Sequence, residues 1–254
     1  MLTINTIPCL NDNYSYIIHD DVKSLTGVVD PSEFDPIDKF IKNKYDKLDY
    51  IFNTHHHNDH IGGNAELKKK YKSKIVASAL DEARIPYIDI ALKEERIFKF
   101  GNVFFKILFL PGHTSGHIAF YAAKEKIIFT GDTLFSLGCG RIFEGTYKQM
   151  FNSINKIKNL PLDTKIYCGH EYTKNNLDFC LKYENKNKAL LKKLTWVNER
   201  INSHLPTVPV TLRDELETNI FLRCENIALK NSLQMSEASD EDIFRKLRDL
   251  KDNF

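Results

Sequence analysis

The sequence lacks any apolar run of the roughly 18 residues that a membrane-spanning helix needs. Its first twenty residues, MLTINTIPCLNDNYSYIIHD, lack the basic start, the unbroken apolar stretch and the small-residue cleavage site of a secretory signal. The five cysteines are scattered and never form a CxxC pair. This pattern excludes a disulfide framework and a cysteine-rich zinc finger, so we expect free thiols in a cytoplasmic protein.

A strong excess of charge of either sign is also missing. The 254 residues contain 36 basic and 34 acidic side chains, which gives a formal net charge of +2. Proteins that bind nucleic acid usually carry a basic excess or stripe, so the composition does not favour that partner. With 42% hydrophobic and 28% charged residues, the chain has the composition of an ordinary globular protein. We expect a monomer with a small-molecule substrate, and neither nucleic acid nor a membrane as a partner.

The first two thirds of the chain alternate short apolar runs with helical patterns. Strands are expected at residues 14–19, 25–30, 49–54, 74–78, 103–110, 117–123 and 126–132, and helices at 34–45 and 64–71. The last two strands are separated only by Lys124 and Glu125, which indicates a hairpin. Helices interleaved with strands of mixed pairing predict an α/β sandwich.

Beyond about residue 170 the pattern becomes helical. Two apolar stripes have helical spacing: Leu190, Leu194, Val197 and Ile201, then Ile243, Leu247, Leu250 and Phe254. The segment HLPTVPVTLRDE between them, residues 204–215, holds two prolines and is expected to be a connector. We therefore expect two domains, residues 1–170 and a helical domain at 171–254.

Seven of the nine histidines lie in three short clusters: THHHNDH (54–60), PGHTSGH (111–117) and CGHEYT (168–173). Each cluster follows an apolar run, and Asp132 follows another one in FTGDTLF. Loops at the ends of strands commonly carry binding groups. These four segments are therefore expected to meet at one edge of the sheet.

The spacing within THHHNDH indicates more than one metal ion. In an extended segment His55 and His57 point to the same side, and His56 points away. Asp59 and His60 follow where the chain turns into a helix. A catalytic zinc site uses about three protein ligands and leaves a position for water. His55, His57, Asp59 and His60 are therefore more ligands than one such ion needs.

The other clusters supply the remaining ligands of a binuclear site. His113 would complete a group with His55 and His57, and His170 would complete one with Asp59 and His60. The carboxylate of Asp132 can bridge two cations about 3.5–4 Å apart, and nitrogen and oxygen ligands suit zinc first, with iron or manganese as alternatives.

Six further residues, in, near or outside the clusters, are not expected to bind metal. His56 would support the site or lie at the surface, whereas His117 could steady a neighbouring ligand or only pack. His19 and His204 stand alone, and Cys139 and Cys168 have the character of small packing residues.

The motifs THxHxDH, PGHTxGH, GDTLF and GHEYT resemble those of the metallo-β-lactamase superfamily. GCGRIFEGT (138–146), CGHEYT and the final RDLKDNF are similar to the hydroxyacylglutathione hydrolase (glyoxalase II) family, and the resemblance covers essentially the whole chain. It implies an αββα sandwich followed by a C-terminal α-helical domain. It also implies the same division of the metal ligands between two cations.

The resemblance further implies glutathione-binding groups at Arg141, Phe143, Tyr172, Arg248 and Lys251. Some members of the family have lysine at the first position and tyrosine at the second. Arg141 keeps the charge, whereas Phe143 has no hydroxyl group to donate. Arg248 and Lys251 are expected on the helix face opposite the apolar stripe, where they would clamp a carboxylate or else form a solvated surface.

The implied activity is hydrolysis of S-D-lactoylglutathione to D-lactate and glutathione, the second step of methylglyoxal detoxification. Metal binding lowers the pKa of water from about 15.7 to about 7, so a metal-bound hydroxide, hydrogen-bonded to Asp59, is the expected nucleophile. Asp132 and Asp59 are thus the expected catalytic carboxylates. The leaving thiolate needs little protonation, because a thiol has a pKa of about 8.5.

Other functions stay open on the sequence alone. Within the superfamily they are a persulfide dioxygenase, a β-lactamase or a nuclease, although lactamases of this fold commonly have cysteine at the position of Asp132. Outside enzymes, the alternative is a metal-stabilised binding protein.

Overall fold

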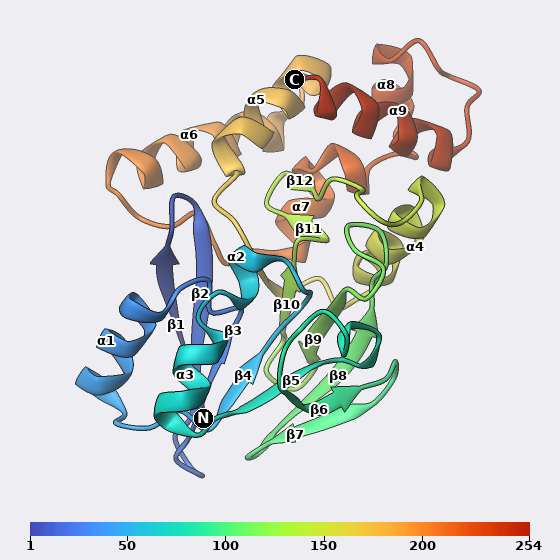
Figure 1. The fold of residues 1–254 in the computed structure, drawn as a ribbon. Coiled ribbons are helices and arrows are strands. Elements are labelled where there is room, and N and C mark those ends of the chain that lie inside the picture. Colours follow the sequence, from blue (N-terminus) through green and yellow to red (C-terminus); the bar gives the residue numbers. More distant parts are fainter.

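The computed structural model describes residues 1–254 and contains two six-stranded sheets packed face to face (Figure 1). The first sheet has the order β1 (Leu2–Cys9), β2 (Asn13–Asp20), β3 (Leu25–Val29), β4 (Tyr50–Phe52), β5 (Lys74–Ser78), β6 (Ile88–Leu92). The second has the order β14 (Val210–Thr211), β13 (Lys165–Cys168), β10 (Ile127–Gly131), β9 (Ile118–Ala122), β8 (Val103–Phe109), β7 (Ile97–Phe100). A short hairpin stands apart from both sheets and consists of β11 (Leu134–Phe135) and β12 (Gly138–Cys139).

Helices cover both outer faces and form a separate layer at the C-terminal end (Figure 1). They are α1 (Phe34–Lys44), α2 (Asn58–Ile61), α3 (Asn64–Tyr71), α4 (Tyr147–Lys158), α5 (Thr173–Glu184), α6 (Lys188–Asn202), α7 (Leu212–Thr218), α8 (Ile227–Ser232) and α9 (Asp240–Asp252), with 3-10 turns η1 (Ala79–Asp81) and η2 (Ile220–Leu222). The predicted αββα sandwich with a helical C-terminal region is confirmed.

Aromatic side chains fill the space between the two sheets. Phe52 of β4 packs edge-on against Phe120 of β9, with ring centroids 5.3 Å apart, and Phe105 of β8 lies beside both. Burying such rings contributes about 25 cal/mol for each Å² of apolar surface removed from water. Val103, Phe105 and Ile107 of the strand run VFFKILF face this core. On the other side of the strand Leu108 joins the apolar cluster that includes residues of α4, whereas Phe104 is 53% exposed.

The carboxyl ends of three strands of the second sheet lie at the same edge. β10 is parallel to β13, and β8 runs in the same direction because both β8 and β10 are antiparallel to β9. The segments after these strands carry His113, Asp132 and His170, and the segment after β4 carries His55. The meeting of four polar segments at one edge is therefore confirmed.

The C-terminal stripes are buried only in part. Leu190 and Val197 of α6, and Ile243 and Leu247 of α9, are fully buried. The last residue of each stripe is exposed, Ile201 by 38% and Phe254 by 49%. The faces were located correctly, but each stripe extends beyond the surface that it covers.

Two expected elements differ from the structure. Residues 204–215 are not only a connector, because the segment enters β14, which pairs with β13, and then α7. The start of α7 is a capping box between Thr211 and Asp214. The strand expected at 49–54 ends at Phe52, since the Asn53 and Thr54 side chains bond to the site loops instead.

No helix is long and apolar enough to cross a membrane. All five cysteines are free and buried.

Candidate active site

Three histidine nitrogens converge in what we call the three-histidine group: His55, His57 and His113. His57 Nδ1 lies 3.1 Å from His55 Nε2 and 3.0 Å from His113 Nε2. The first two residues follow β4 and the third follows β8, so both sheets contribute. His55 is completely buried and His113 is nearly so, which fixes both rings.

A second set, which we call the carboxylate group, consists of Asp59, His60 and His170. His60 Nε2 lies 3.3 Å from His170 Nε2, and Asp59 Oδ2 lies 3.6 Å and 3.4 Å from these two atoms. Asp59 and His60 belong to the single-turn helix α2. Gly62 and Gly63 at its end allow the chain to touch Ser32 and Glu33, where a Cβ atom would come within 3.0 Å of backbone oxygens.

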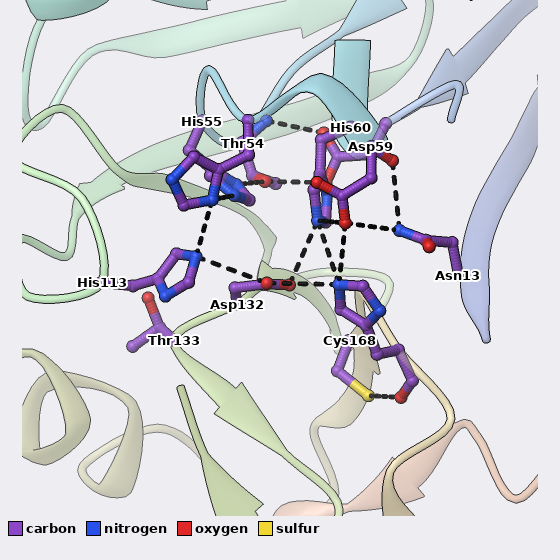
Figure 2. Close-up of polar contacts among 12 residues, drawn as sticks. Asn13, Thr54, His55, Asp59, His60, His113, Asp132, Thr133 and Cys168 are labelled. Atoms are coloured by element: carbon purple, nitrogen blue, oxygen red, sulfur yellow. Dashed lines mark hydrogen bonds and ion pairs between the residues drawn. The ribbon is translucent and has the colours of Figure 1, made fainter. Parts of the chain in front are cut away.

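Asp132 lies between the two groups (Figure 2). Its Oδ2 is 3.4 Å from His113 Nε2 and 3.3 Å from His170 Nε2, and its Oδ1 is 3.4 Å from His60 Nε2. The carboxylate is buried, and Oδ1 makes no hydrogen bond. One carboxylate therefore faces both groups, with one oxygen left without a hydrogen bond at the centre of the site.

Hydrogen bonds behind two rings of the three-histidine group, those of His55 and His113, fix their tautomers. Thr54 Oγ donates to Asp30 Oδ2 and can therefore accept the Nδ1–H of His55 at 3.0 Å. His113 Nδ1 donates to the carbonyl oxygen of Arg141 at 2.8 Å. Each ring thereby turns the lone pair of Nε2 toward the centre of the site.

Carboxylates play the same part behind the other group. His60 Nδ1 lies 3.0 Å from Asp30 Oδ2, and His170 Nδ1 lies 2.8 Å from Asp12 Oδ1. Asn13 Nδ2 donates to Asp59 Oδ2 at 3.0 Å (Figure 2). Such partners orient metal-binding side chains and raise the basicity of histidine ligands.

The histidine pKa values are shifted in opposite directions in the two groups. Burial is the main cause that lowers the pKa values of His55 and His113, and it lowers that of His57 to about 4. Burial also opposes the charged forms of His60 and His170, but Asp132 and the other nearby carboxylates outweigh it and raise both pKa values well above the usual range.

This donor set fits divalent cations. Three neutral ring nitrogens that face one another cannot all satisfy each other by hydrogen bonds, since a nitrogen without hydrogen only accepts. The ligand atoms of each group lie within 4.8 Å of one another. A cation at each centre would use the inward lone pairs and the unbonded oxygen of Asp132, which is the arrangement expected of a metal site.

The remaining histidines do not point a free nitrogen into either group. His117 is buried, stacks on His55 with ring centroids 4.9 Å apart, and accepts the backbone N–H of Asp132 at 3.1 Å. His56 turns away toward Glu144, with Nε2 3.3 Å from its Oε1. His19 stacks on Tyr45, far from the clusters in the fold, and His204 is exposed.

A cavity of about 590 Å³ opens beside both groups. All five residues expected to bind glutathione line it: Arg141, Phe143, Tyr172, Arg248 and Lys251. The ring of Tyr172 stacks on His170 with centroids 4.7 Å apart, and the 62% exposed ring of Phe143 lies 5.2 Å from that of His113. Their role in substrate binding stays a prediction.

The orientation expected for Arg248 and Lys251 is wrong. Arg248 is only 2% exposed, donates to the carbonyl oxygen of Cys139 at 2.7 Å and pairs with Asp252 at 2.9 Å. Lys251 is half-buried and donates to the carbonyl oxygen of Asn175 at 3.3 Å. Helix α9 buries a second face beside its apolar stripe, because backbone carbonyls and a carboxylate satisfy the charge there.

Side chains of the C-terminal region hold the hairpin β11–β12. The carbonyl oxygens of residues 135–140 accept hydrogen bonds from these donors: Asn219 (135 and 138), Asn176 (136), Cys180 (137) and Arg248 (139 and 140). The hairpin connects Asp132 with Arg141. The C-terminal region therefore shapes this wall of the cavity as well as lining it.

Four supporting residues were not identified from the sequence: Asp12, Asn13, Asp30 and Thr54. A usable signal exists for each, because Asp30 and Thr54 follow β3 and β4 at the same edge as the clusters, and NDNY stands at the turn between β1 and β2. Their partners are distant in sequence, 158 residues away in the case of Asp12 and His170.

Comparisons with known proteins agree with this fold and site. Residues 12–170 match the model of the metallo-beta-lactamase superfamily, and residues 171–254 match the model of the hydroxyacylglutathione hydrolase C-terminus. The crystal structure of ETHE1 from Myxococcus xanthus is 20% identical, with a TM-score of 0.70, and the match covers 98% of this chain and 91% of that one. The fold and the site thus define a member of the metallo-β-lactamase superfamily.

Two curated relatives are called hydroxyacylglutathione hydrolase. The protein from Pelagibacter ubique (strain HTCC1062) is 51% identical over 253 residues, covering 100% of both chains. That from Methylococcus capsulatus (strain ATCC 33009 / NCIMB 11132 / Bath) is 41% identical over 254 residues, covering 100% of this chain and 99% of its own. Within the superfamily, the chain belongs to the hydroxyacylglutathione hydrolase family.

The two model matches meet between residues 170 and 171. The division into domains at this point stays a prediction, since β14 and a shared apolar core cross it.

Proposed function

We propose that the chain hydrolyses S-D-lactoylglutathione to D-lactate and glutathione, the second step of methylglyoxal detoxification. The observation that carries this proposal is the juxtaposition of two convergent ligand groups with a cavity lined by Arg141 and Lys251. Glutathione has two carboxylates and one ammonium group, so cationic side chains at the mouth of the cavity suit it. Family membership over the full chain agrees with this substrate.

Two divalent metal ions are the proposed cofactors, with zinc first and iron or manganese as alternatives. The three-histidine group would hold one ion, the carboxylate group the other, and Asp132 would bridge them. When bound, the ions supply a Lewis acid and lower the pKa of water. A structural relative, TTHA1623, was crystallised in a di-iron-bound form, and it is 26% identical with a TM-score of 0.56, covering 66% of this chain and 91% of its own.

Asp59 is the proposed acceptor for the proton of the attacking water. Its carboxyl is ionised because the hydrogen bond from His170 and the charge of His60 lower its pKa, outweighing burial. Asn13 holds Oδ2 of this side chain in place. A positioned carboxylate within hydrogen-bond reach of the nucleophile can take its proton as the carbonyl is attacked.

The cavity residues orient the substrate and leave the thiolate free to depart. The side chain of Arg141 is 63% exposed and can reach a carboxylate of the glutathione moiety. Lys251, which also lines the cavity, offers a second cation. Tyr172 and Phe143 present flat apolar surfaces beside the two ligand groups. The thiolate leaves without a dedicated acid, because a thiol with a pKa of about 8.5 is a good leaving group.

We also propose a monomeric cytoplasmic enzyme. Five free and buried cysteines suit a reducing compartment. Light scattering coupled to size-exclusion chromatography tests the oligomeric state, and a stable dimer would contradict it.

Hydrolysis of S-D-lactoylglutathione by the purified protein, with elemental analysis of the same sample, tests the proposal. We expect turnover and close to two metal ions per chain, and loss of turnover after treatment with a chelator. A fully loaded protein without thioesterase activity would contradict the substrate. Oxygen consumption with a glutathione persulfide would indicate a dioxygenase instead.

A further inference from the structure

Glu144 belongs to the segment GCGRIFEGT but has no part in metal or substrate binding as described above. It lies in residues 140–146, a loop without helix or strand that also carries Arg141 and Phe143. This loop, which we call the substrate loop, forms one rim of the cavity. Its conformation must be held by contacts outside itself, because it lacks the hydrogen bonds of regular structure.

The carboxylate of Glu144 gathers donors from three other segments. Arg84 Nη1 donates to both of its oxygens, at 2.9 Å and 2.7 Å. The backbone N–H and the hydroxyl of Ser115 both donate to Oε2 at 2.8 Å. His56 Nε2 lies 3.3 Å from Oε1. Hydrogen bonds from Ser115 and the charge and hydrogen bond of Arg84 outweigh burial and hold the pKa of Glu144 at about 2, so the group is ionised.

Arg84 is anchored in turn. Its Nη2 donates to Asp81 and, at 3.0 Å, to Ser115 Oγ. Asp81 is completely buried in the turn η1. The carboxylate of Glu144 is thus tied through one guanidinium to a rigid part of the fold, and charge-assisted bonds of this kind are about twice as strong as neutral ones.

Three hydrogen bonds hold the backbone of the substrate loop against the PGHTSGH segment: Phe143 N donates to His113 O at 3.2 Å, Gly145 N donates to Gly112 O at 3.0 Å, and Arg141 O accepts from His113 Nδ1 at 2.8 Å. Glu144 adds the side-chain bonds that tie the loop to Arg84, outside that segment, and to Ser115. From these contacts we infer that Glu144, clamped by Arg84 and Ser115, is a positioning residue that sets Arg141 and Phe143 for the glutathione moiety.

The inference rests on the proposed function, so its test separates glutathione binding from chemistry. The experiment compares the wild type with Glu144→Ala, using S-methylglutathione binding by calorimetry and hydrolysis of two lactoyl thioesters. One thioester carries glutathione and the other carries N-acetylcysteamine, which lacks both carboxylates. Glu144→Ala leaves Arg84 with Asp81 and Ser115 as partners, so the fold is expected to survive.

We expect the Kd for S-methylglutathione and the KM for the glutathione thioester to rise on the order of 10-fold in Glu144→Ala, since the binding groups lose their position. The kcat/KM for the N-acetylcysteamine thioester and the metal content should match those of the wild type. Glu144→Gln keeps an acceptor for Arg84 and Ser115, so it should restore most of the affinity. The matched control is Lys126→Ala, which breaks an exposed ion pair with Asp163 on another part of the surface and should change nothing.

An unchanged Kd in Glu144→Ala would overturn the inference. So would an equal loss with both thioesters or a loss of metal, because the residue would then support the metal site or the fold. Absence of S-methylglutathione binding to the wild type would overturn it as well. A wild type that binds S-methylglutathione but hydrolyses neither thioester would contradict the proposed function alone.

Discussion

The two ligand groups contain similar side chains but are backed by opposite kinds of partner. Behind the three-histidine group stand a hydroxyl, from Thr54, and a backbone carbonyl, from Arg141. Behind the carboxylate group stand the carboxylates of Asp30 and Asp12. Burial lowers the histidine pKa values in the first group, whereas in the second group Asp132 and then these carboxylates outweigh burial and raise them.

This difference predicts two ways of binding a cation. At neutral pH the three-histidine group is already deprotonated, so a cation would bind to it without displacing protons. The carboxylate group carries protons on His60 and His170 when no metal is present, and a cation would have to displace them. In exchange, its extra negative charge attracts the cation more strongly.

The largest expected effect comes from the residue that the two groups share. Replacing Asp132 with alanine should lower kcat/KM by at least the order of 10³-fold, because bound metal supplies several kcal/mol of stabilisation. Metal should be lost from both groups, since the carboxylate lies within 3.4 Å of histidines in each. Steady-state kinetics and elemental analysis check this. A variant that keeps both ions would show that the groups are independent.

The next effect is a pH dependence confined to one group. His60 and His170 have raised pKa values in the metal-free protein, so metal affinity of the carboxylate group should rise with pH through the neutral range, by about 10-fold per pH unit for each proton displaced. The three-histidine group should show little change between about pH 6 and about pH 8, because its histidines have lowered pKa values and are deprotonated there.

Calorimetric titration of the metal-free protein with zinc at the two pH values measures both constants. An equal change in the two constants would remove the distinction between the groups.

A smaller effect is expected from one backing residue. Asp12→Ala should lower the affinity of the carboxylate group for its metal ion by on the order of 10-fold, because His170 loses its partner. The affinity of the three-histidine group should not change. Asp12→Asn is the matched control, since its amide oxygen can still accept from Nδ1. Metal content after dialysis against a weak chelator checks the order of loss. Release of both ions together would indicate a general loosening of the site.

The smallest expected effect is a change of KM with pH that comes from Lys251, which belongs to neither ligand group. Burial, followed by the charges of Arg248 and Arg141, lowers the pKa of Lys251 to about 8. The lysine is therefore charged below that pH and neutral above it, so KM for the glutathione thioester should rise less than about 10-fold as pH increases through about 8. Lys251→Arg should keep KM flat over this range. A rise in KM of the same size in Lys251→Arg would assign it to another group.

Much of the fold was predictable because its signals are local. Strand and helix periods located α1, α3, β5 and the hairpin of β9 and β10 nearly to the residue. The single turn of α2 and the two-residue strand β14 are too short to show a period. The capping box of Thr211 and Asp214 was the one available sign that a helix begins there.

The candidate ligands could be predicted for a related reason. Each cluster follows a strand, and topology alone brings the ends of β4, β8, β10 and β13 together. The supporting residues Asp30 and Thr54 also follow strands, but nothing local assigns their partners, and Asp12 meets His170 only in the folded chain. Arg248 was expected on an exposed face because charged side chains on a helix are usually solvated. Here it is buried, since the carbonyl oxygen of Cys139 accepts a hydrogen bond from its guanidinium and the carboxylate of Asp252 pairs with it.

Hairpin β11–β12 is hydrogen-bonded to Asn176, Asn219 and Arg248 of the C-terminal region. These bonds limit which C-terminal regions of related enzymes could replace the one in this chain. A helical region transplanted from a relative brings its own donors, and these must match six consecutive carbonyl groups on the recipient. New acyl or thiol preferences are thus more accessible through point changes on the open rim than through exchange of whole segments. A change of the helical region would therefore require a matching change of the hairpin.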